Sequence, residues 1–318
     1  MSQPSRPHLL IVVAGPTGAG KSDLALSLAS QFSGEIVSCD SIQVYRGLDI
    51  GSAKTPMSVR RDIPHHLIDI ARPDQEVTAG DYQRLGRAVL NEIASRSHSP
   101  IVAGGTGFYL RALLEGLSDA PGRSDTLRRR LLRIAKCRPT ALHRILSRSD
   151  PSAASRIHAN DHQKLIRAIE IAALSSQTAS AVQSRARPPL EGFHVIKLGL
   201  LPPRAALHER LNRRAEQMFA EGLLDEAQRL LDSGYGSNLK PLQSLGYKQA
   251  LDVLSGRLSI GEAVAECQLK TRQYAKRQLT WFRADSDIVW LNGFGFEPHI
   301  QSTAAARVAE FDTLLKAI

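Results

Sequence analysis

The octapeptide GPTGAGKS, Gly15–Ser22, constrains the fold more than any other stretch of the sequence. It fits the pattern G-x-x-x-x-G-K-[ST] and lies between the apolar run HLLIVVA and the helical pattern KSDLALSLASQF. In such a strand–loop–helix unit, backbone N–H groups face phosphate oxygens and the helix N-terminus adds partial positive charge. We therefore predict a phosphate-binding loop made of Gly15, Pro16, Thr17, Gly18, Ala19, Gly20, Lys21 and Ser22. Lys21 would supply a point charge, and the Ser22 hydroxyl a ligand for Mg²⁺.

Two later segments repeat the strand pattern. GEIVSCDS predicts a short strand that ends at Asp40, and SPIVAGGTGFYLRALLEG predicts a strand at 100–103, a glycine turn and a helix from about Gly107. Strands that alternate with helices imply an α/β fold with a parallel sheet, here a P-loop NTPase-like core. Ligands of such sheets bind at the carboxyl ends of the strands. Gly15, Asp40 and Thr106 all lie at such ends, so we expect them to converge.

A basic segment interrupts this pattern. Residues 121–160 hold ten Lys and Arg against two acids, helical spacing continues to about Ala181, and QSRARPPLEG is typical of a linker. We therefore predict a basic helical insertion at 121–190, within a core formed by residues 1–120 and 191–318.

The predicted core resumes with the strand pattern FHVIKLGLLPP. One long helix is then expected from about Arg204 to Ser233, because Gly234 is a typical helix stop.

Charge and composition narrow the class of protein. The formal net charge is +10 and the pI is near 9.8, which favours a polyanionic partner such as nucleic acid over a merely soluble basic protein. The three cysteines have no C-x-x-C spacing and indicate reduced thiols. The apolar run near the N-terminus is too short for a signal peptide or a membrane span. We expect a cytoplasmic monomer without membrane contact.

The P-loop alone does not say which molecule carries the phosphates. A P-loop ATPase or kinase usually places a second acid at the end of a hydrophobic strand, whereas PIVAGGT ends in glycines and a threonine. Asp40 could hold the metal, as in a kinase, or it could serve an acceptor molecule. A small-molecule or nucleotide kinase and a non-catalytic RNA-binding protein with a P-loop switch both remain alternatives at this point.

Seven motifs occur in order: GPTGAGKS, SCDSIQVYRGLDIGSAKT, PHHLIDI, VAGGTGFYLRALLEGL, RIHANDHQKLIRAIEI, GYKQAL and TRQYAKRQLTWFR. Together, over roughly residues 8–290, they closely resemble the bacterial tRNA dimethylallyltransferases. Ser22 stands where that family usually has Thr, and Ala159 where it has the Pro of HPND. The resemblance implies transfer of a dimethylallyl group from dimethylallyl diphosphate to N6 of adenosine-37, beside the anticodon, in tRNAs reading codons that begin with U.

The resemblance also implies roles for individual residues. Asp40 would accept a proton from the adenine amine, while Thr106 and Arg214 would meet the charge that develops on the diphosphate, with Mg²⁺ at Ser22. Arg210 and Arg213 would be solvated or face RNA. The implied contacts to the anticodon stem-loop are Asp40, Ser41, Ile42, Gln43, Thr106, Arg128, Gln163, Lys164, Leu165, Ile166 and Arg167.

Other residues stay ambiguous on the sequence. YAKRQLTWFR mixes Lys276 and Arg277 with aromatic side chains and suits RNA phosphates and stacked bases, but Trp281 and Phe282 could equally belong to the core. The pairs His65/His66 and His158/His162 lack the partners of a zinc site. Cys39 is interpreted as a small buried strand residue.

Overall fold

The computed structural model describes residues 7–185 and 187–317, and the chain divides into two compact units. The core unit comprises the described residues up to Leu114 and those from Leu190 onward, and the helical unit comprises Glu115–Pro189. The helical unit thus begins before residue 121, where composition places the boundary. Glu115 Oε2 contacts Arg187 Nη1 at 3.4 Å, so the two connecting segments run beside each other at the base of this unit.

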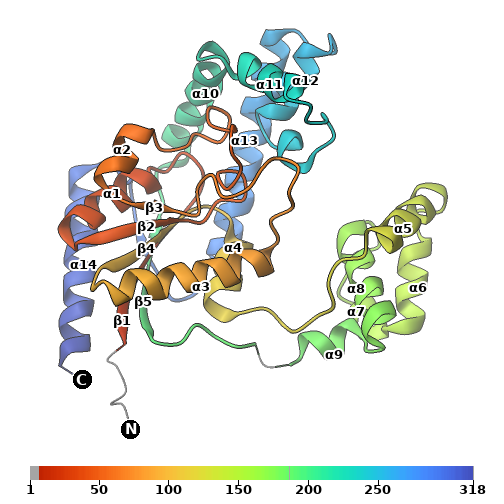
Figure 1. The fold of residues 1–318 in the computed structure, drawn as a ribbon, viewed down its shortest axis with the longest axis horizontal. Helices are drawn as coiled ribbons and strands as arrows, with labels where there is room; N and C mark the ends of the chain where they lie inside the picture. Colours follow the sequence, from red (N-terminus) through yellow and green to blue (C-terminus); the bar gives the residue numbers. More distant parts are fainter. Residues whose placement is uncertain (1–6, 186, 318) are drawn as a thin grey trace. The chain divides into compact units, whose positions relative to one another are not determined.

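The core unit is built on a six-stranded sheet in the order β3-β2-β4-β1-β5-β6, and every pairing between the strands is parallel (Figure 1). This confirms the predicted parallel α/β core. The strands are β1 (His8–Ala14), β2 (Gly34–Ser38), β3 (His65–His66), β4 (Ser99–Ala103), β5 (Phe193–Leu200) and β6 (Ile288–Leu291).

Helices cover both faces of the sheet, as a parallel sheet requires. Ile11 and Val13 of β1 pack with residues of α1 (Lys21–Gln31) and α14 (Pro298–Lys316), whereas Leu10 and Val12 belong to the opposite cluster. That second cluster takes side chains from three helices, α3 (Ala79–Ser95), α4 (Gly107–Glu115) and α13 (Ile260–Phe282). The alternation along β1 explains why its sequence is continuously apolar.

The prediction of one helix from Arg204 to Ser233 is wrong. The segment forms α10 (Arg204–Ala220) and α11 (Leu223–Asp232), separated by Gly222 with φ of 101°. This left-handed conformation suits glycine. It turns α11 so that its apolar face packs in one cluster with α12 (Tyr247–Leu254). The remaining elements of the core unit are α2 (Met57–Asp62) and the 3₁₀ helix η1 (Lys240–Gln243).

The helical unit has a hydrophobic core of its own. Its elements are α5 (Asp125–Cys137), α6 (Ala141–Ser149), α7 (Pro151–Ala154), α8 (His162–Ser175) and α9 (Ala179–Gln183). Leu131, Leu142, Leu146 and Leu165 lie at its centre. Within the described residues of both units, we find no helix with the length and apolar character needed to cross a membrane.

Candidate active site

The predicted P-loop connects β1 to α1 and is enclosed by a second loop near the end of the chain. Gly20 has φ of 84° and forms the N-terminal cap of α1. A Cβ at Gly20 would lie 2.8 Å from the Gly295 nitrogen, and Gly295 N–H donates to the Ala19 carbonyl at 2.9 Å. Only glycine therefore permits both the backbone turn and this close approach.

One buried glutamine joins the P-loop to the turn that follows β4. Gln278, on α13, accepts from Thr17 N–H through Oε1 at 2.8 Å and donates from Nε2 to the Gly105 carbonyl at 2.8 Å. A Cβ at Gly105 would lie 2.2 Å from Gln278 Nε2, so a larger residue there would displace the Gln278 amide from these partners. Sequence reasoning missed Gln278, although it lies within the quoted motif TRQYAKRQLTWFR.

A cavity of about 570 Å³ opens at the carboxyl ends of the strands, entirely within the core unit. The P-loop, the turn after β4, the loop after β2 and one face of α10 form its walls. The lining residues are Thr17, Gly18, Gly20, Lys21, Ser22, Asp23, Asp40, Gln43, Ser52, Ala53, Ala103, Gly104, Gly105, Ala206, Glu209, Arg210, Arg213, Arg214, Gln217, Phe294 and Phe296. Residues from five distant segments of the sequence thus meet in one polar pocket.

Two partly buried cations dominate the electrostatics of this cavity. Lys21 Nζ donates to the Pro16 carbonyl at 2.7 Å, and burial lowers the pKa of Lys21 to about 8, although nearby Asp40 opposes the shift. Burial also lowers the pKa of Arg214, whose Nη1 lies 3.5 Å from Thr17 Oγ1. Desolvated cations interact strongly with an anion that replaces the lost water. The cavity is therefore suited to a phosphate or diphosphate group.

Asp40 follows β2 and faces the same cavity. Its Oδ1 accepts from Ile42 N–H at 2.8 Å and from Gln43 N–H at 3.3 Å, which fixes the orientation of the carboxylate. The expected convergence of the strand ends is present here. Thr106 Oγ1 accepts from Ser41 N–H at 3.1 Å, which places Thr106 beside the Asp40 loop and just beyond the cavity-lining turn Ala103–Gly105.

Gln43 spans the loop that follows Asp40. Its Oε1 accepts from Ser38 Oγ at 3.0 Å, and its Nε2 donates to the Ser52 carbonyl at 3.2 Å and the Ala53 carbonyl at 3.4 Å. The amide thereby connects the end of β2 to the far side of the loop. Ser41 and Ile42, the other predicted base contacts, lie in the sequence between Asp40 and Gln43.

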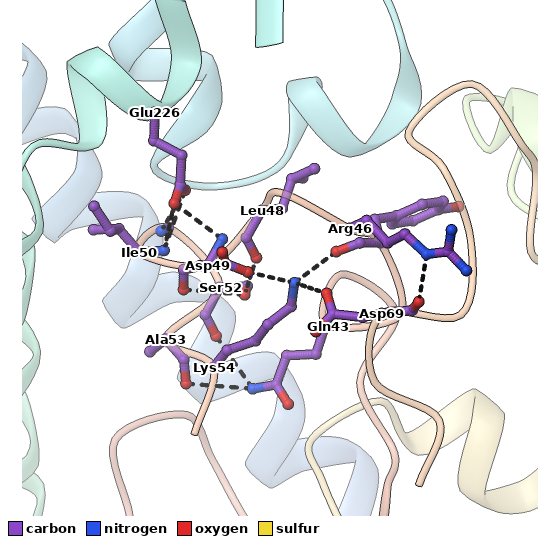
Figure 2. A network of polar contacts seen from close by, with 12 residues as sticks. Gln43, Arg46, Leu48, Asp49, Ile50, Ser52, Ala53, Lys54, Asp69 and Glu226 are labelled. Carbon is purple, nitrogen blue, oxygen red and sulfur yellow. Dashed lines mark hydrogen bonds and ion pairs between the residues drawn. The ribbon is translucent and has the colours of Figure 1, made fainter. Parts of the chain in front are cut away.

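Two further residues, Lys54 and Glu226, hold the loop that follows β2 in place, as Figure 2 shows. Lys54 Nζ donates to the Tyr45 carbonyl at 2.7 Å and contacts Asp49 and Asp69, each at 2.6 Å. Buried Glu226, from α11, accepts from the backbone N–H groups of residues 49–51 at 2.9 to 3.4 Å and also from the Tyr247 hydroxyl. Sequence reasoning found neither residue.

Arg210 and Arg213 line the cavity beside Arg214. The Arg210 guanidinium lies 4.6 Å from the ring centroid of Phe296, and Arg213 Nη2 contacts Glu209 at 2.6 Å. Both side chains are exposed to solvent, in line with the expectation that they are solvated or RNA-facing, and both also line the cavity.

The predicted RNA contacts of the helical unit fall into two groups. Arg128 and Arg167 contact fully buried Glu170, with N–O distances of 2.9 to 3.1 Å. Leu165 and Ile166 are buried in the core of this unit. The side chains of Gln163 and Lys164 are exposed at the start of α8. The stretch 163–167 thus offers two exposed polar side chains to a partner, and its apolar members support the helix.

Three ambiguous residues of the core unit are resolved by their burial. Phe282 is buried, whereas Trp281 is 44% exposed and its ring centroid lies 5.9 Å from the Arg111 guanidinium. Cys39 is buried as expected, and burial raises the pKa of its thiol to about 12. Of the histidines considered for zinc, His66 instead contacts buried Glu35 at 2.6 Å.

Comparison with known proteins gives a consistent result. Residues 43–285 match the family model described as IPP transferase. The chain is 51% identical over 302 residues to a tRNA dimethylallyltransferase of Solibacter usitatus, with 95% of this chain and 98% of that protein covered. It is 44% identical over 283 residues to a tRNA dimethylallyltransferase of Geobacter sulfurreducens, with 89% and 91% covered.

Solved structures show the same likeness. A full-length tRNA isopentenylpyrophosphate transferase from Bacillus halodurans superposes with a TM-score of 0.70 at 34% identity, covering 96% of this chain and 99% of the other. A eukaryotic dimethylallyltransferase described as acting on tRNA gives a TM-score of 0.77 at 27% identity, covering 95% and 77%. The match extends through both units of the chain.

Proposed function

The chain belongs to the IPP transferase family and is a tRNA prenyltransferase, and we propose that dimethylallyl diphosphate is its donor and N6 of adenosine-37 its acceptor. The acceptor tRNAs would be those reading codons that begin with U. We propose that the protein acts on this substrate in the cytoplasm. The observation that carries the proposal is the cavity in which the partly buried Lys21 and Arg214 lie with Asp40.

The cations and Asp40 suit the two halves of this reaction. As N6 attacks the allylic carbon, a C–N bond forms and the C–O bond to diphosphate breaks. Asp40 would accept the proton that N6 loses, since its carboxylate is held by the backbone N–H groups of Ile42 and Gln43. Lys21, Arg214 and the P-loop N–H groups would stabilise the charge that grows on the leaving oxygens. Thr106 supports this arrangement by positioning Ser41.

The residues at the P-loop fit a magnesium ion. Mg²⁺ in such sites takes one or two protein oxygens together with substrate phosphates and water. The Ser22 hydroxyl lines the cavity with the carboxylates of Asp23 and Asp40, so oxygen ligands are present. We propose that Ser22 holds the ion, which when bound would neutralise charge on the diphosphate.

The acceptor side of the cavity is formed by the loop after β2. Gln43 and Asp40 line it, and Ser41 and Ile42 lie between them in sequence. A flipped adenine has hydrogen-bonding groups along its Watson–Crick edge, which side chains of this loop would recognise. In the helical unit, we propose that Gln163 and Lys164 contact the stem-loop directly, with Arg128 and Arg167 supporting α8 through Glu170.

The test incubates the enzyme with bulk tRNA, labelled dimethylallyl diphosphate and Mg²⁺, without any nucleotide. We expect N6-prenylated adenosine at position 37 and release of diphosphate. Modification that requires ATP and is accompanied by ATP cleavage would overturn the proposal in favour of a kinase-like reaction. Dimethylallyl transfer to another position of the tRNA would support the proposed donor and contradict the proposed acceptor.

A further inference from the structure

A second pocket, of about 550 Å³, lies between α5 and α6 of the helical unit. We call it the α5–α6 groove. Its lining residues are Arg133, Ile134, Cys137, Arg138, Ala141, Arg144, Ile145 and Arg148. Four guanidinium groups therefore surround a small apolar floor.

The groove is a consequence of how α6 uses its two faces. Leu142 and Leu146 are fully buried in the core of the helical unit. Arg144 and Arg148 are one helical turn apart on a different stripe, which also carries Ile145. Because α6 is only nine residues long, the groove takes up much of the helix that the core does not use.

The groove arginines differ from the other arginines of this unit in their partners. Arg128 and Arg167 contact Glu170, and Arg123 contacts Asp125. Among the ion pairs of the described chain, none joins a carboxylate to Arg133, Arg138, Arg144 or Arg148, and all four side chains are exposed. Four like charges around one pocket repel each other and create a positive potential that an anion would relieve.

We propose that the α5–α6 groove binds backbone phosphates of the tRNA substrate, a step that rests on the proposed function. Guanidinium groups bind phosphate oxygens through two parallel N–H donors, and several arginines can hold successive phosphates of one strand. RNA is favoured over an acidic peptide because the family to which the chain belongs acts on tRNA. Phosphate contacts fix the orientation of a nucleic acid without reading its sequence, so the groove would orient the stem while the core unit selects the base.

The first experiment compares two double variants of the full chain. Arg144→Gln/Arg148→Gln removes two groove charges, and Arg156→Gln/Arg185→Gln removes two exposed charges of the same unit outside the groove. tRNA affinity is measured from low to high salt. Each lost phosphate contact should reduce the slope of log K against log salt by about 0.7–0.9, so the groove variant should lose about 1.5 and bind at least tenfold more weakly at low salt.

The second experiment uses the unmodified protein. Cys137 is exposed in the groove, whereas Cys39 and Cys267 are buried, so N-ethylmaleimide should alkylate Cys137 first. Bound tRNA should slow this alkylation at least tenfold, and high salt should remove the protection. Both readouts are expected together if the groove holds the phosphate backbone.

Two outcomes would overturn the inference. One is a groove variant that binds tRNA with the same salt slope as the control variant. The other is a Cys137 alkylation rate that saturating tRNA leaves unchanged. Failure of the proposed function gives a different result, because the wild-type protein would then form no prenylated adenosine at any salt concentration. Retained turnover of the groove variant at saturating tRNA supports a role in binding.

Discussion

The active-site cavity and the α5–α6 groove present positive charge in opposite ways. In the core unit, Lys21 and Arg214 are partly buried, and this burial lowers the pKa of each. In the helical unit, the arginines of the α5–α6 groove are exposed to solvent. Exposed charges are screened by salt over roughly 10 Å at 0.1 M, whereas buried charges are screened much less. We therefore expect the cavity to hold one anion in a fixed geometry and the groove to attract an extended polyanion.

This difference predicts how substitutions in the two pockets will act. Charge removed from the cavity should lower turnover at every salt concentration, because the lost interaction develops as diphosphate leaves. Charge removed from the groove should lower affinity for tRNA mainly at low salt.

The largest effect is expected for Asp40→Ala. A general base contributes typically about 10²–10⁴ in rate, so kcat should fall by that factor while donor and tRNA binding change little. The matched control is Asp62→Ala, which removes an exposed carboxylate of the core unit that does not line the cavity. Single-turnover prenylation at saturating substrates measures both variants. Retention of more than about a tenth of wild-type turnover by Asp40→Ala would show that Asp40 is not the base.

A somewhat smaller effect is expected for Arg214→Gln. Loss of one donor to a developing oxyanion costs about 10²–10³ in kcat, and Arg214 is the partly buried arginine beside Thr17. Arg213→Gln is the control, because Arg213 is exposed and contacts Glu209. We expect at most a few-fold change for that variant, measured as kcat at saturating donor. Equal losses of kcat in the two variants would show that partial burial does not distinguish Arg214 from Arg213 in the reaction.

The local part of this site could be predicted from the sequence. GPTGAGKS is recognisable because all its functional groups lie within eight residues, and Asp40 and Thr106 because each follows an apolar strand. Both signals depend on neighbours in the chain. The parallel sheet could be predicted in the same way, since each strand–helix unit has a sequence pattern of its own.

The residues that support the site could not be predicted in this way. Gln278 binds Thr17 across 261 positions, and Glu226 binds Ile50 across 176. No local pattern marks a glutamine or a glutamate for a distant partner. The break at Gly222 was missed for a similar reason, because glycine is tolerated within helices and the packing of α11 against α12 decides the turn.

The pH dependence of donor binding should report the charge of Lys21 directly. We expect diphosphate to bind the protonated form of Lys21, and burial lowers the pKa of Lys21 to about 8 in the free enzyme. Below pH 8 the lysine stays charged, so the KM for the donor should be nearly constant. Above pH 8 the charged fraction falls, so KM should rise up to about tenfold per pH unit.

The control for this pH profile is Lys21→Arg. A guanidinium stays protonated throughout the range, so the variant should lose the rise in KM even where its kcat is lower. Initial rates between pH 6.5 and 9.5 at saturating tRNA provide the measurement. A wild-type KM that stays flat to pH 9.5 would show that Lys21 does not meet the diphosphate.

The smallest effect on RNA binding is expected within the helical unit, for Arg128→Gln. Arg128 holds Glu170, which is fully buried, so its loss leaves a charged carboxylate with Arg167 and the Ser124 N–H as the remaining partners. The free energy of unfolding should fall by about 1–3 kcal/mol, the cost of leaving a buried group partly unsatisfied. Affinity for tRNA should change by less than about threefold when the variant is folded.

The groove double variant should behave in the opposite way, with weaker binding and unchanged stability. Thermal unfolding and tRNA titration at the same salt concentration separate the two cases. An Arg128→Gln protein that keeps its stability and loses most of its affinity would identify Arg128 as a direct contact to RNA, and the distinction between paired and unpaired arginines in this unit would then fail.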